Sequence, residues 1–446
     1  MNAFVHEPAR RTPVIAEADV VVLGGGPAGL AAAASCAGQG ASTLLVERYG
    51  FLGGMGTAAG VTNFCGLFAN VHGEIRRVVH GIADELLDRM QHAGGLKDPH
   101  EIFGKTRAQA YDMPAFKLAA DELLLESGAQ LLFHSLGAGV CMDGERAIDA
   151  LIVETKSGRG AVRGKIFIDA SGDGDLAHWA GARWEKGDEN GHLLYPTLMF
   201  RINGVDPARA DAEAINTLMA QAATEGSHRF PRKGAIVRPQ KNPSEWRANV
   251  TQIRNSAGLA MDGTDAMQFS AGEIEGRRQI GEYFRFLRER VPGFEASYIL
   301  DIAPQVGIRE TRRVVGRYML TAEDVLGCAS FTDTIGVNGW PLEQHVAGDV
   351  KWTWPAIPQS RGFNQLPLRM LLSPDIDNLL VAGRCASMTS AAQSAARVSG
   401  GCFVMGQAAG TCAALALGEH CMPADLDVAT LQSRLERDRA WLGRED

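Results

Sequence analysis

The stretch DVVVLGGGPAGLAAAASCAGQGASTLLVE, residues 19–47, decides the fold. Its apolar, β-branched run over residues 19–23 predicts a buried parallel strand, and the alanine-rich residues 30–37 predict a helix. A second apolar strand is expected over residues 42–47. The pattern G-x-G-x-x-G lies between the first strand and the helix, in the order that a dinucleotide-binding βαβ unit requires.

Each glycine of this pattern has a physical role in such a unit. Gly24 makes the tight turn, Gly26 lets a pyrophosphate approach the backbone, and Gly29 lets the helix pack closely on the strand. Pro27 stands at about the first helical position, where its missing N–H costs no hydrogen bond. Glu47 ends the second strand and is placed to accept hydrogen bonds from a ribose. The helix N-terminus offers free N–H groups to the phosphates.

These residues leave FAD, NAD and NADP open as the dinucleotide. Glu47 disfavours NADP because it would repel a 2′-phosphate, although the neighbouring Arg48 weakens that inference. Glycine is abundant in the whole chain, with 52 of 446 residues, and it has no Gly-X-Y period. The excess therefore indicates turns, or close contact between the backbone and a ligand.

Composition excludes several classes of protein. With 44 Lys and Arg against 52 Asp and Glu, the net charge of −8 disfavours nucleic acid as a partner. No apolar run approaches the roughly 18 residues that a membrane helix needs, and residues 1–18 lack the apolar segment of a secretory signal. The eight cysteines are scattered without a C-x-x-C pair. We therefore expect no metal site, reduced thiols and a cytoplasmic protein.

Further glycine-rich segments follow along the chain. RYGFLGGMGT, residues 48–57, comes directly after the second strand. The apolar strand and turn IFIDASGDGD occupy residues 166–175, and NLLVAGR at residues 378–384 repeats the same strand-to-glycine pattern. An Ala/Gly-rich helix is expected at residues 405–410. The chain thus holds four glycine-rich segments that lie far apart in the sequence.

Taken together, these segments resemble the FAD-dependent oxidoreductases of the glutathione-reductase-like superfamily. The chain is similar to the branch near fumarate reductase flavoproteins and the flavin subunit of heterodisulfide reductase, over about residues 19–418. The resemblance implies an α/β fold with a Rossmann-like FAD-binding domain, made of a parallel sheet with helices plus a small inserted β-sheet. It also implies a second α+β substrate or cap domain, and FAD as the cofactor.

The resemblance implies that Gly401 to Gly406 open a helix whose N-terminus points at the flavin O2. There its positive end would stabilise the negative charge of the reduced ring. The residues implied to contact FAD are Gly24, Gly26, Pro27, Ala28, Gly29, Glu47, Arg48, Gly53, Gly54, Met55, Thr57, Ala170, Ser171, Gly172, Asp175, Gly383, Arg384, Gly401 and Gly406.

The predicted domain boundaries follow the distribution of the glycine-rich segments, which cease after about residue 193. A helix with apolar periodicity is expected over residues 273–290, inside the glycine-poor region. The expected units are 15–192, the first part of the FAD-binding domain; 193–300, the substrate or cap domain; 301–327, a return to the FAD-binding domain; 328–366, a second cap segment; 367–420, the C-terminal part of the FAD-binding domain; and 421–446, a C-terminal helix and tail.

Three residues are candidates for substrate handling. Arg309 has the chemistry to clamp a carboxylate bidentately, or to join a structural ion-pair network with Glu310 and Arg313. Arg397 would neutralise reduced flavin or substrate, or else pin the loop before the C-terminal helix. His345 has the chemistry of a base near pH 7, although a single histidine is more often a packing residue. No metal ligands are predicted.

The predicted function is a dehydrogenase or oxidase that moves a hydride between a small organic substrate and flavin N5, with a carboxylate-bearing substrate as one option. One alternative is a monooxygenase that uses NAD(P)H and O2, although residues 193–302 hold no second G-x-G-x-x-G pattern. Others are an electron-transfer subunit of a larger complex and an enzyme of the thiazole-synthase type. The electron acceptor stays open among O2, a quinone and a carrier protein, as does homo-oligomerisation.

Overall fold

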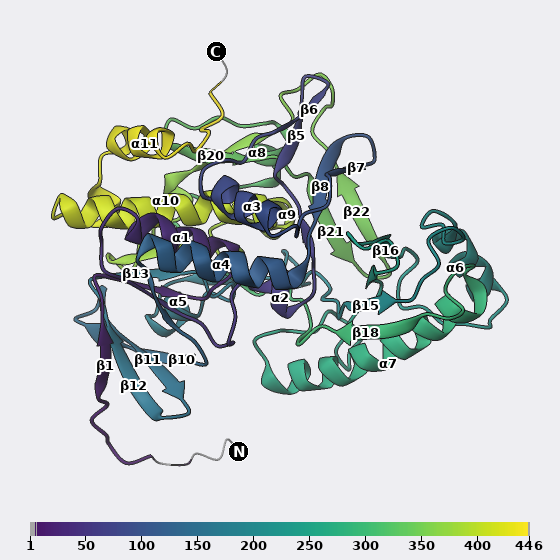
Figure 1. Cartoon of the computed structure of the whole chain (residues 1–446). Helices are drawn as coiled ribbons and strands as arrows, with labels where there is room; N and C mark the ends of the chain where they lie inside the picture. The colour runs from purple at the N-terminus through teal and green to yellow at the C-terminus, as the bar shows by residue number, and fades with distance from the viewer. Residues whose placement is uncertain (1–4, 6, 445–446) are drawn as a thin grey trace.

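A five-stranded parallel sheet forms the centre of the larger lobe (Figure 1). The structure is a computed structural model that describes residue 5 and residues 7–444. The strands Val20–Leu23 and Thr43–Val46 are buried along their whole length because helices cover one face of the sheet and a second, smaller sheet packs on the other. In spatial order the strands are β24 (Leu379–Val381), β13 (Ile166–Asp169), β2 (Val20–Leu23), β3 (Thr43–Val46) and β9 (Gln130–Leu132).

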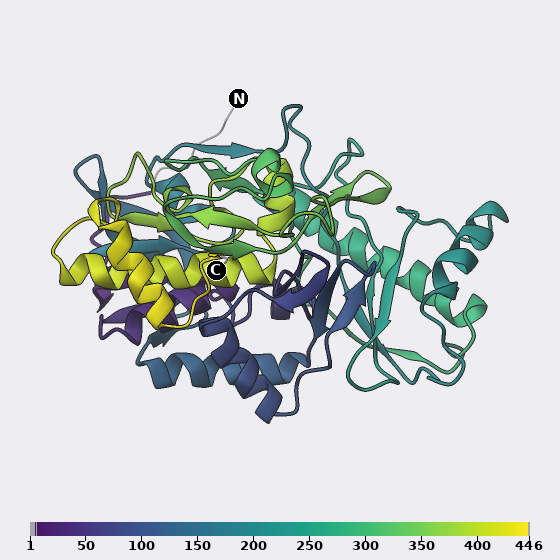
Figure 2. The same ribbon diagram turned by 90° about the horizontal axis from the view of Figure 1, so that it is seen from above.

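Two long helices from opposite ends of the sequence lie against each other on this sheet. They are α1 (Pro27–Ala37) and α10 (Ser399–Gly418), which lie side by side in Figures 1 and 2. Glycines allow the close approach, because a Cβ on Gly406 would overlap the carbonyl oxygen of Ala28. A Cβ on Gly410 would overlap the carbonyl of Ala32 in the same way. The first and last parts of the chain therefore share one core.

The helix α10 corrects one expectation from sequence. Its 20 residues have a mean hydropathy of 1.4, so by length and composition it is a candidate membrane span. The stretch does not stand out in the sequence because Gly, Ser, Thr and Gln interrupt its apolar residues, while no charged residue lowers the mean. In the folded chain 83% of the most apolar window is buried, as in the core helix of a globular domain.

A second, smaller sheet extends the same lobe, where the sequence predicted an inserted sheet. Three of its strands run antiparallel, and the first strand of the chain joins its edge in parallel orientation. A turn at residues 144–146 joins two of its strands, with Gly144 in the left-handed region at φ +68°. In spatial order the strands are β1 (Val14–Glu17), β12 (Gly158–Arg163), β11 (Ala147–Thr155) and β10 (Leu136–Asp143).

A second lobe, drawn in teal in Figures 1 and 2, has its own apolar core within residues 198–308. The long helix α7 (Ala266–Arg290) lies along it and begins seven residues before the predicted start. Ile274 is one of the apolar residues in the predicted range 273–290, but 66% of this residue is exposed. The other elements are α6 (Ala214–Thr224) and the antiparallel strands β16 (Ile236–Pro239), β17 (Trp246–Asn249), β15 (Phe200–Asn203) and β18 (Tyr298–Ile302).

Residues 328–366, expected to be a second cap segment, contribute to the core of the larger lobe. Ile335, Val337 and Leu366 are buried there together with α10. Their strands form two antiparallel pairs, and three further small sheets complete the fold. The pairs are β20 (Thr334–Asn338) with β23 (Asn364–Pro367), and β21 (Leu342–Val346) with β22 (Asp349–Thr353). The small sheets are β4 (Asn63–Phe64), β8 (Thr106–Ala110) and β7 (His100–Ile102); β5 (Phe68–Val71) and β6 (Glu74–Arg77); and β14 (Trp184–Lys186) and β19 (Arg312–Val314).

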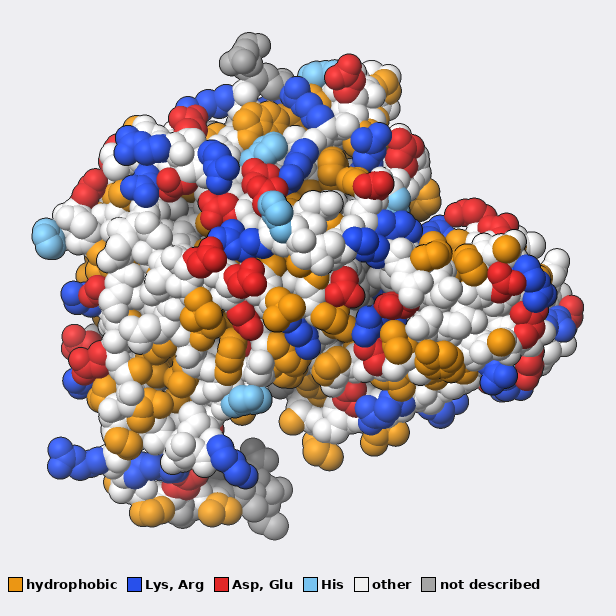
Figure 3. Space-filling view, in the orientation of Figure 1, with side chains coloured by type: hydrophobic (Ala, Val, Ile, Leu, Met, Phe, Trp, Pro, Cys, Tyr) orange, Lys and Arg blue, Asp and Glu red, His pale blue; other side chains and the backbone are white. Residues whose placement is uncertain are grey.

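The remaining helices cover the larger lobe. One of them is α4 (Met113–Ser127). Acidic and basic side chains are interspersed on the face seen in Figure 3. Residues 445–446 of the predicted C-terminal tail lie outside the described residues. The other helices are α2 (Met55–Ala58), α3 (Ile82–His92), α5 (Asp175–Trp179), α8 (Ala322–Leu326), α9 (Ser390–Ala396), α11 (Val428–Arg437) and two 3₁₀ turns, Leu368–Met370 and Pro423–Asp425.

Candidate active site

A cavity of about 570 Å³ opens where the central parallel strands end. The segments that follow β2, β3, β13 and β24 all line it, at the carboxyl edge of the sheet. Ligands of open α/β sheets bind in this position. Residues of the second lobe and of the β21–β22 hairpin complete the wall.

One part of the cavity wall is a surface of glycine backbone. Gly24 has φ +101°, and a Cβ there would lie 2.5 Å from the carbonyl oxygen of Ala170. Gly26 is the N-cap of α1, and no side chain caps that helix end. Gly54 has φ +52°, and a Cβ there would lie 2.7 Å from the Cα of Gly26. The bare backbone and the open helix N-terminus fit the pyrophosphate of a dinucleotide.

Most of the residues that the sequence implicated in cofactor binding line this cavity. Their direct contact with FAD remains a prediction, because their placement alone does not identify the ligand. The predicted cofactor residues in the wall are Gly24, Gly26, Pro27, Ala28, Glu47, Arg48, Gly54, Met55, Ala170, Ser171, Gly172, Asp175, Gly383 and Arg384.

Three predicted cofactor residues lie behind the wall and support it. A Cβ on Gly29 would overlap the carbonyl oxygen of Gly24, so this glycine permits the predicted close packing of helix on strand. Gly53 donates its N–H to the carbonyl of Gly25 at 2.8 Å. The hydroxyl of Thr57 donates to the carbonyl of Leu52 at 2.7 Å. Gly53 and Thr57 therefore hold the loop in place without lining the cavity.

The helix α10 meets the cavity in a different register from the prediction. It begins at Ser399, with Val398 as N-cap, and these two residues line the cavity. Gly401 lies two residues further on in the first turn, where a Cβ would overlap the carbonyl of Ala396, and Gly406 packs against α1. The helix N-terminus does face the cavity, but neither glycine lines it.

The carboxylate of Glu47 organises the glycine turn. Its Oε2 accepts a hydrogen bond from the N–H of Gly25 at 2.6 Å, and its Oε1 accepts one from the N–H of Tyr49 at 3.0 Å. Arg48 donates from Nη2 to the side-chain oxygen of Gln305 at 3.1 Å. Glu47 thus lines the cavity while each of its carboxylate oxygens accepts a hydrogen bond from a backbone N–H.

An acidic turn follows β13. Ser171 donates its hydroxyl to Asp169 at 2.6 Å, and Arg384 forms an ion pair with Asp173 at 3.0 Å. Asp175 accepts a hydrogen bond from Arg312 at 2.9 Å. Burial, with the nearby charges of Asp173 and Asp169, raises the pKa of Asp175 to about 6.

Arg309 lies at the cavity wall and is buried, with 6% of the residue exposed. Its Nη1 donates to the carbonyl of Tyr195 at 2.6 Å and to the hydroxyl of Thr197 at 2.7 Å. The predicted alternative, an ion-pair network, exists between Glu310 and Arg313 and does not include Arg309. Burial, followed by the charge of Arg397, lowers the pKa of Arg309 well below its usual value.

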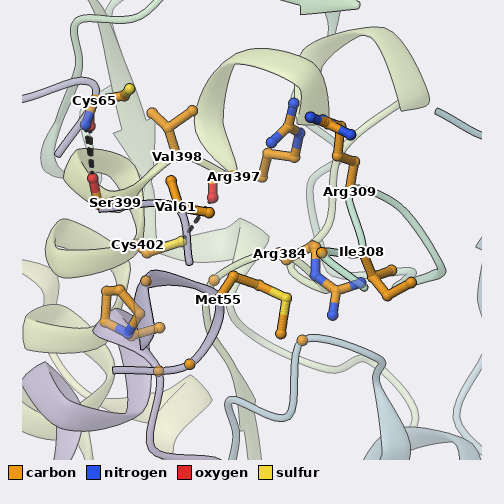
Figure 4. A pocket seen from close by; sticks show the side chains of 18 of the residues that line it. Met55, Val61, Cys65, Ile308, Arg309, Arg384, Arg397, Val398, Ser399 and Cys402 are labelled. Carbon is orange, nitrogen blue, oxygen red and sulfur yellow. Dashed lines mark hydrogen bonds between the residues drawn. The ribbon is translucent and has the colours of Figure 1, made fainter. Parts of the chain in front are cut away.

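Arg397 brings a second guanidinium to the same place. Its Nε and Nη2 are buried and have no hydrogen-bond partner among the residues that the structure describes. Figure 4 shows the Arg309 and Arg397 side chains beside each other, above Met55 and Arg384. A buried cation without a partner is costly, so this pair of arginines is suited to an anionic ligand.

His345 is buried beside Glu343, and its Nε2 lies 3.1 Å from the Glu343 Oε1. Burial, and then the charge of Arg309, lower the pKa of His345 to about 3. The imidazole is therefore neutral at pH 7 but is a weak base there. Burial alone would raise the pKa of Glu343, but the hydrogen bond from His345 and the nearby positive charges lower it to about 2.

The sequence reasoning missed two residues of this charged cluster, Arg247 and Glu343. Arg247 lies on β17 in the second lobe and is 6% exposed, and its Nε has no hydrogen-bond partner. It looked ordinary in sequence because only its complete burial sets it apart. Glu343 accepts a hydrogen bond from the indole N–H of Trp340 at 2.9 Å. Its proximity to His345 by two positions was the one available signal.

Comparisons with known proteins identify the family. A family model described as FAD dependent oxidoreductase matches residues 19–435. A search of curated proteins found no match. Among solved structures, a geranylgeranyl bacteriochlorophyll reductase-like protein from Thermoplasma acidophilum is 14% identical, with a TM-score of 0.48 over 95% of this chain and 83% of that chain.

A second similar structure is the p-nitrophenol 4-monooxygenase PnpA from Pseudomonas putida DLL-E4. It is 11% identical, with a TM-score of 0.46 over 97% of this chain and 91% of that chain. Both TM-scores are below 0.5, so neither likeness bears on the function. The family model, in contrast, covers nearly the whole chain. This chain therefore belongs to the FAD-dependent oxidoreductase family and is an enzyme with FAD as its cofactor.

Proposed function

We propose that the chain is a dehydrogenase or oxidase that acts on a small organic molecule carrying a carboxylate. The carrying observation is that one cavity joins the glycine surface at Gly24, Gly26 and Gly54 to the buried arginines Arg309 and Arg397. When bound, FAD supplies a hydride acceptor at N5 of its ring. The relation to the fumarate reductase branch is part of this proposal and rests on the sequence segments alone.

Each group of residues has a part in the proposed reaction. The glycine surface and the N-terminus of α1 hold the pyrophosphate. Arg309 and Arg397 bind the substrate carboxylate and orient the rest of the molecule, because a guanidinium matches a carboxylate in shape and charge. The neutral His345 keeps Glu343 in position by a hydrogen bond. Holding the reacting C–H in place then lowers the barrier through orientation.

In this proposal the second lobe forms the part of the cavity wall that covers the substrate. Its residues Ile236, Arg247 and Asn249 line the same cavity. Asn249 contacts Arg309, because its side-chain oxygen lies 3.4 Å from the Arg309 Nη2. We therefore assign residues 193–300 a cap role, which would keep water from the reacting groups.

The test begins with the purified holoenzyme under anaerobic conditions. Small hydroxy acids, amino acids, and the matching neutral alcohols and amines are added one at a time, and the flavin absorbance band is followed. We expect at least one acid to bleach the band and its neutral counterpart to fail. Bleaching by NAD(P)H followed by oxygen incorporation into product would instead favour the monooxygenase alternative. Reoxidation by O2, a quinone or a carrier protein then identifies the acceptor.

A further inference from the structure

We infer that the substrate site takes a carboxylic acid with an aromatic or similarly bulky apolar tail. The inference rests on the proposed function and deepens it. It comes from two features that lie next to each other in the cavity. One is a cluster of three buried arginines, Arg247, Arg309 and Arg397, and the other is an aromatic wall of Phe103, Trp340 and Trp352.

The arginine cluster has more positive charge than its surroundings balance. Glu343 is the carboxylate whose charge acts on all three guanidinium groups. Within the described part of the chain, three buried nitrogens have no hydrogen-bond partner: Nε of Arg247 and Nε and Nη2 of Arg397. Guanidinium groups stay protonated in proteins. The cluster therefore has a net positive charge and free donors, which a carboxylate would satisfy.

The aromatic wall begins at the same Glu343. The Trp340 indole donates to Glu343 and packs edge-to-face on Trp352, with ring centroids 5.9 Å apart. Trp352 in turn meets Phe103 edge-to-face at 5.4 Å. Ile102 packs against the same cluster. These four apolar residues line the cavity.

The arginine cluster and the aromatic wall lie next to each other, and their positions define the orientation of a bound ligand. Trp340 and Val398 share a small apolar cluster with Cys65, and the charges of both Arg247 and Arg397 act on Cys65. The aromatic wall thus starts beside the arginines and runs to Phe103, which is 66% exposed. An anionic head at the arginines places its tail along the rings, where an aromatic group would make edge-to-face contacts.

The test uses three probes on the intact holoenzyme: 3-phenylpropanoate, propanoate and 3-phenylpropanamide. Binding is measured by calorimetry and by the perturbation of flavin absorbance. We expect 3-phenylpropanoate to bind about tenfold or more tighter than propanoate, because of the ring contacts. We also expect it to bind about tenfold or more tighter than the amide, because of the charged hydrogen bonds. Equal affinities within either pair would overturn the inference.

Variants assign the two preferences to their residues. Trp352→Ala should reduce the preference for the ring while leaving propanoate affinity within about twofold. Arg247→Gln should reduce the preference for acid over amide. Trp184→Ala is the matched control, because Trp184 is 38% exposed, does not line the cavity and makes no ring contact with the aromatic wall among the described residues. A loss of ring preference in Trp184→Ala as large as that in Trp352→Ala would contradict the assignment.

Flavin content and the melting temperature of each variant show whether it has folded, and the three probes on the wild-type enzyme decide the inference even if a variant does not. The experiments distinguish failure of this inference from failure of the proposed function. An enzyme that prefers the aryl acid, but whose flavin no panel member bleaches, contradicts only the proposed function. An enzyme that oxidises a small acid without any preference for the ring contradicts only the inference.

Discussion

Gly26 differs from the other cavity glycines because its backbone would accept a side chain. Its φ is −72°, and the nearest atom to a Cβ would be the Gly54 Cα at 3.7 Å. A valine should therefore fold but block the approach of the pyrophosphate. We predict that Gly26→Val changes the melting temperature of the flavin-free protein by less than about 3 °C. FAD occupancy, measured from the flavin-to-protein absorbance ratio, should fall by about tenfold or more.

Gly418→Val is the control for this substitution. Gly418 ends α10, is exposed, and has no atom within 4 Å of a Cβ. FAD occupancy in the control should match the wild type. Normal flavin content in Gly26→Val would contradict the assignment of Gly26 to the pyrophosphate.

The buried His345 should make folding stability depend on pH. The unfolded chain gains a proton on this histidine near pH 6.5, whereas the folded chain stays unprotonated down to about pH 3. Stability therefore decreases as the pH falls below about 6.5, by about 2 kcal/mol at pH 5 for this group. We predict that His345→Gln, which keeps a donor for Glu343, makes the loss of unfolding free energy between pH 7 and pH 5 smaller by that amount. Urea denaturation at the two pH values measures the difference.

His92→Gln serves as the control because His92 is exposed on α3. It should change the pH-dependent loss by less than about 0.5 kcal/mol. An identical loss in wild type and His345→Gln would show that the imidazole becomes protonated in the folded state.

At the scale of elements, the contact between α1 and α10 depends on the absence of side chains. A Cβ on Gly410 would overlap the carbonyl of Ala32, which belongs to the backbone of α1 and cannot turn aside. We predict that Gly410→Ala lowers the unfolding free energy of the flavin-free protein by about 2–3 kcal/mol. Urea unfolding measures this. In Gly418→Ala, the same substitution at an exposed position, stability should stay within about 0.5 kcal/mol of wild type.

This contact shows what sequence patterns could and could not predict. Strand–glycine–helix order identified the parallel sheet and the loops at its edge, because the spacing of residues 19–47 has one physical solution. The role of Gly406 could not be predicted, since a glycine that approaches a ligand and one that approaches another helix look alike in sequence. Arg247 escaped notice for a related reason: its Nε becomes buried without a hydrogen-bond partner among the described residues only after the second lobe has folded.

On the scale of the whole molecule, FAD should stabilise both ends of the chain at once. The cavity wall includes the segments after β2 and after β24, whose core residues belong to one cluster. A ligand that binds only the folded state adds about 2.7 kcal/mol at a concentration 100 times its Kd. We predict that FAD raises the melting temperature of the flavin-free wild type by several degrees. Gly26→Val should show no such rise at the same FAD concentration, and an equal rise in both proteins would argue against the site.

The position of β24 in the sheet has a consequence for biosynthesis. β24 pairs with β13, so the strand that completes this side of the sheet is made about 350 residues after β2. At translation rates of 5–20 residues per second, the ribosome needs roughly 20 to 70 s for that interval. During this interval the glycine turn after β2 has been synthesised, but Gly383, Arg384 and α10 have not. Cofactor loading therefore follows the synthesis of Gly383, Arg384 and α10, and a ribosome that stalls before residue 384 leaves a product without a complete flavin site.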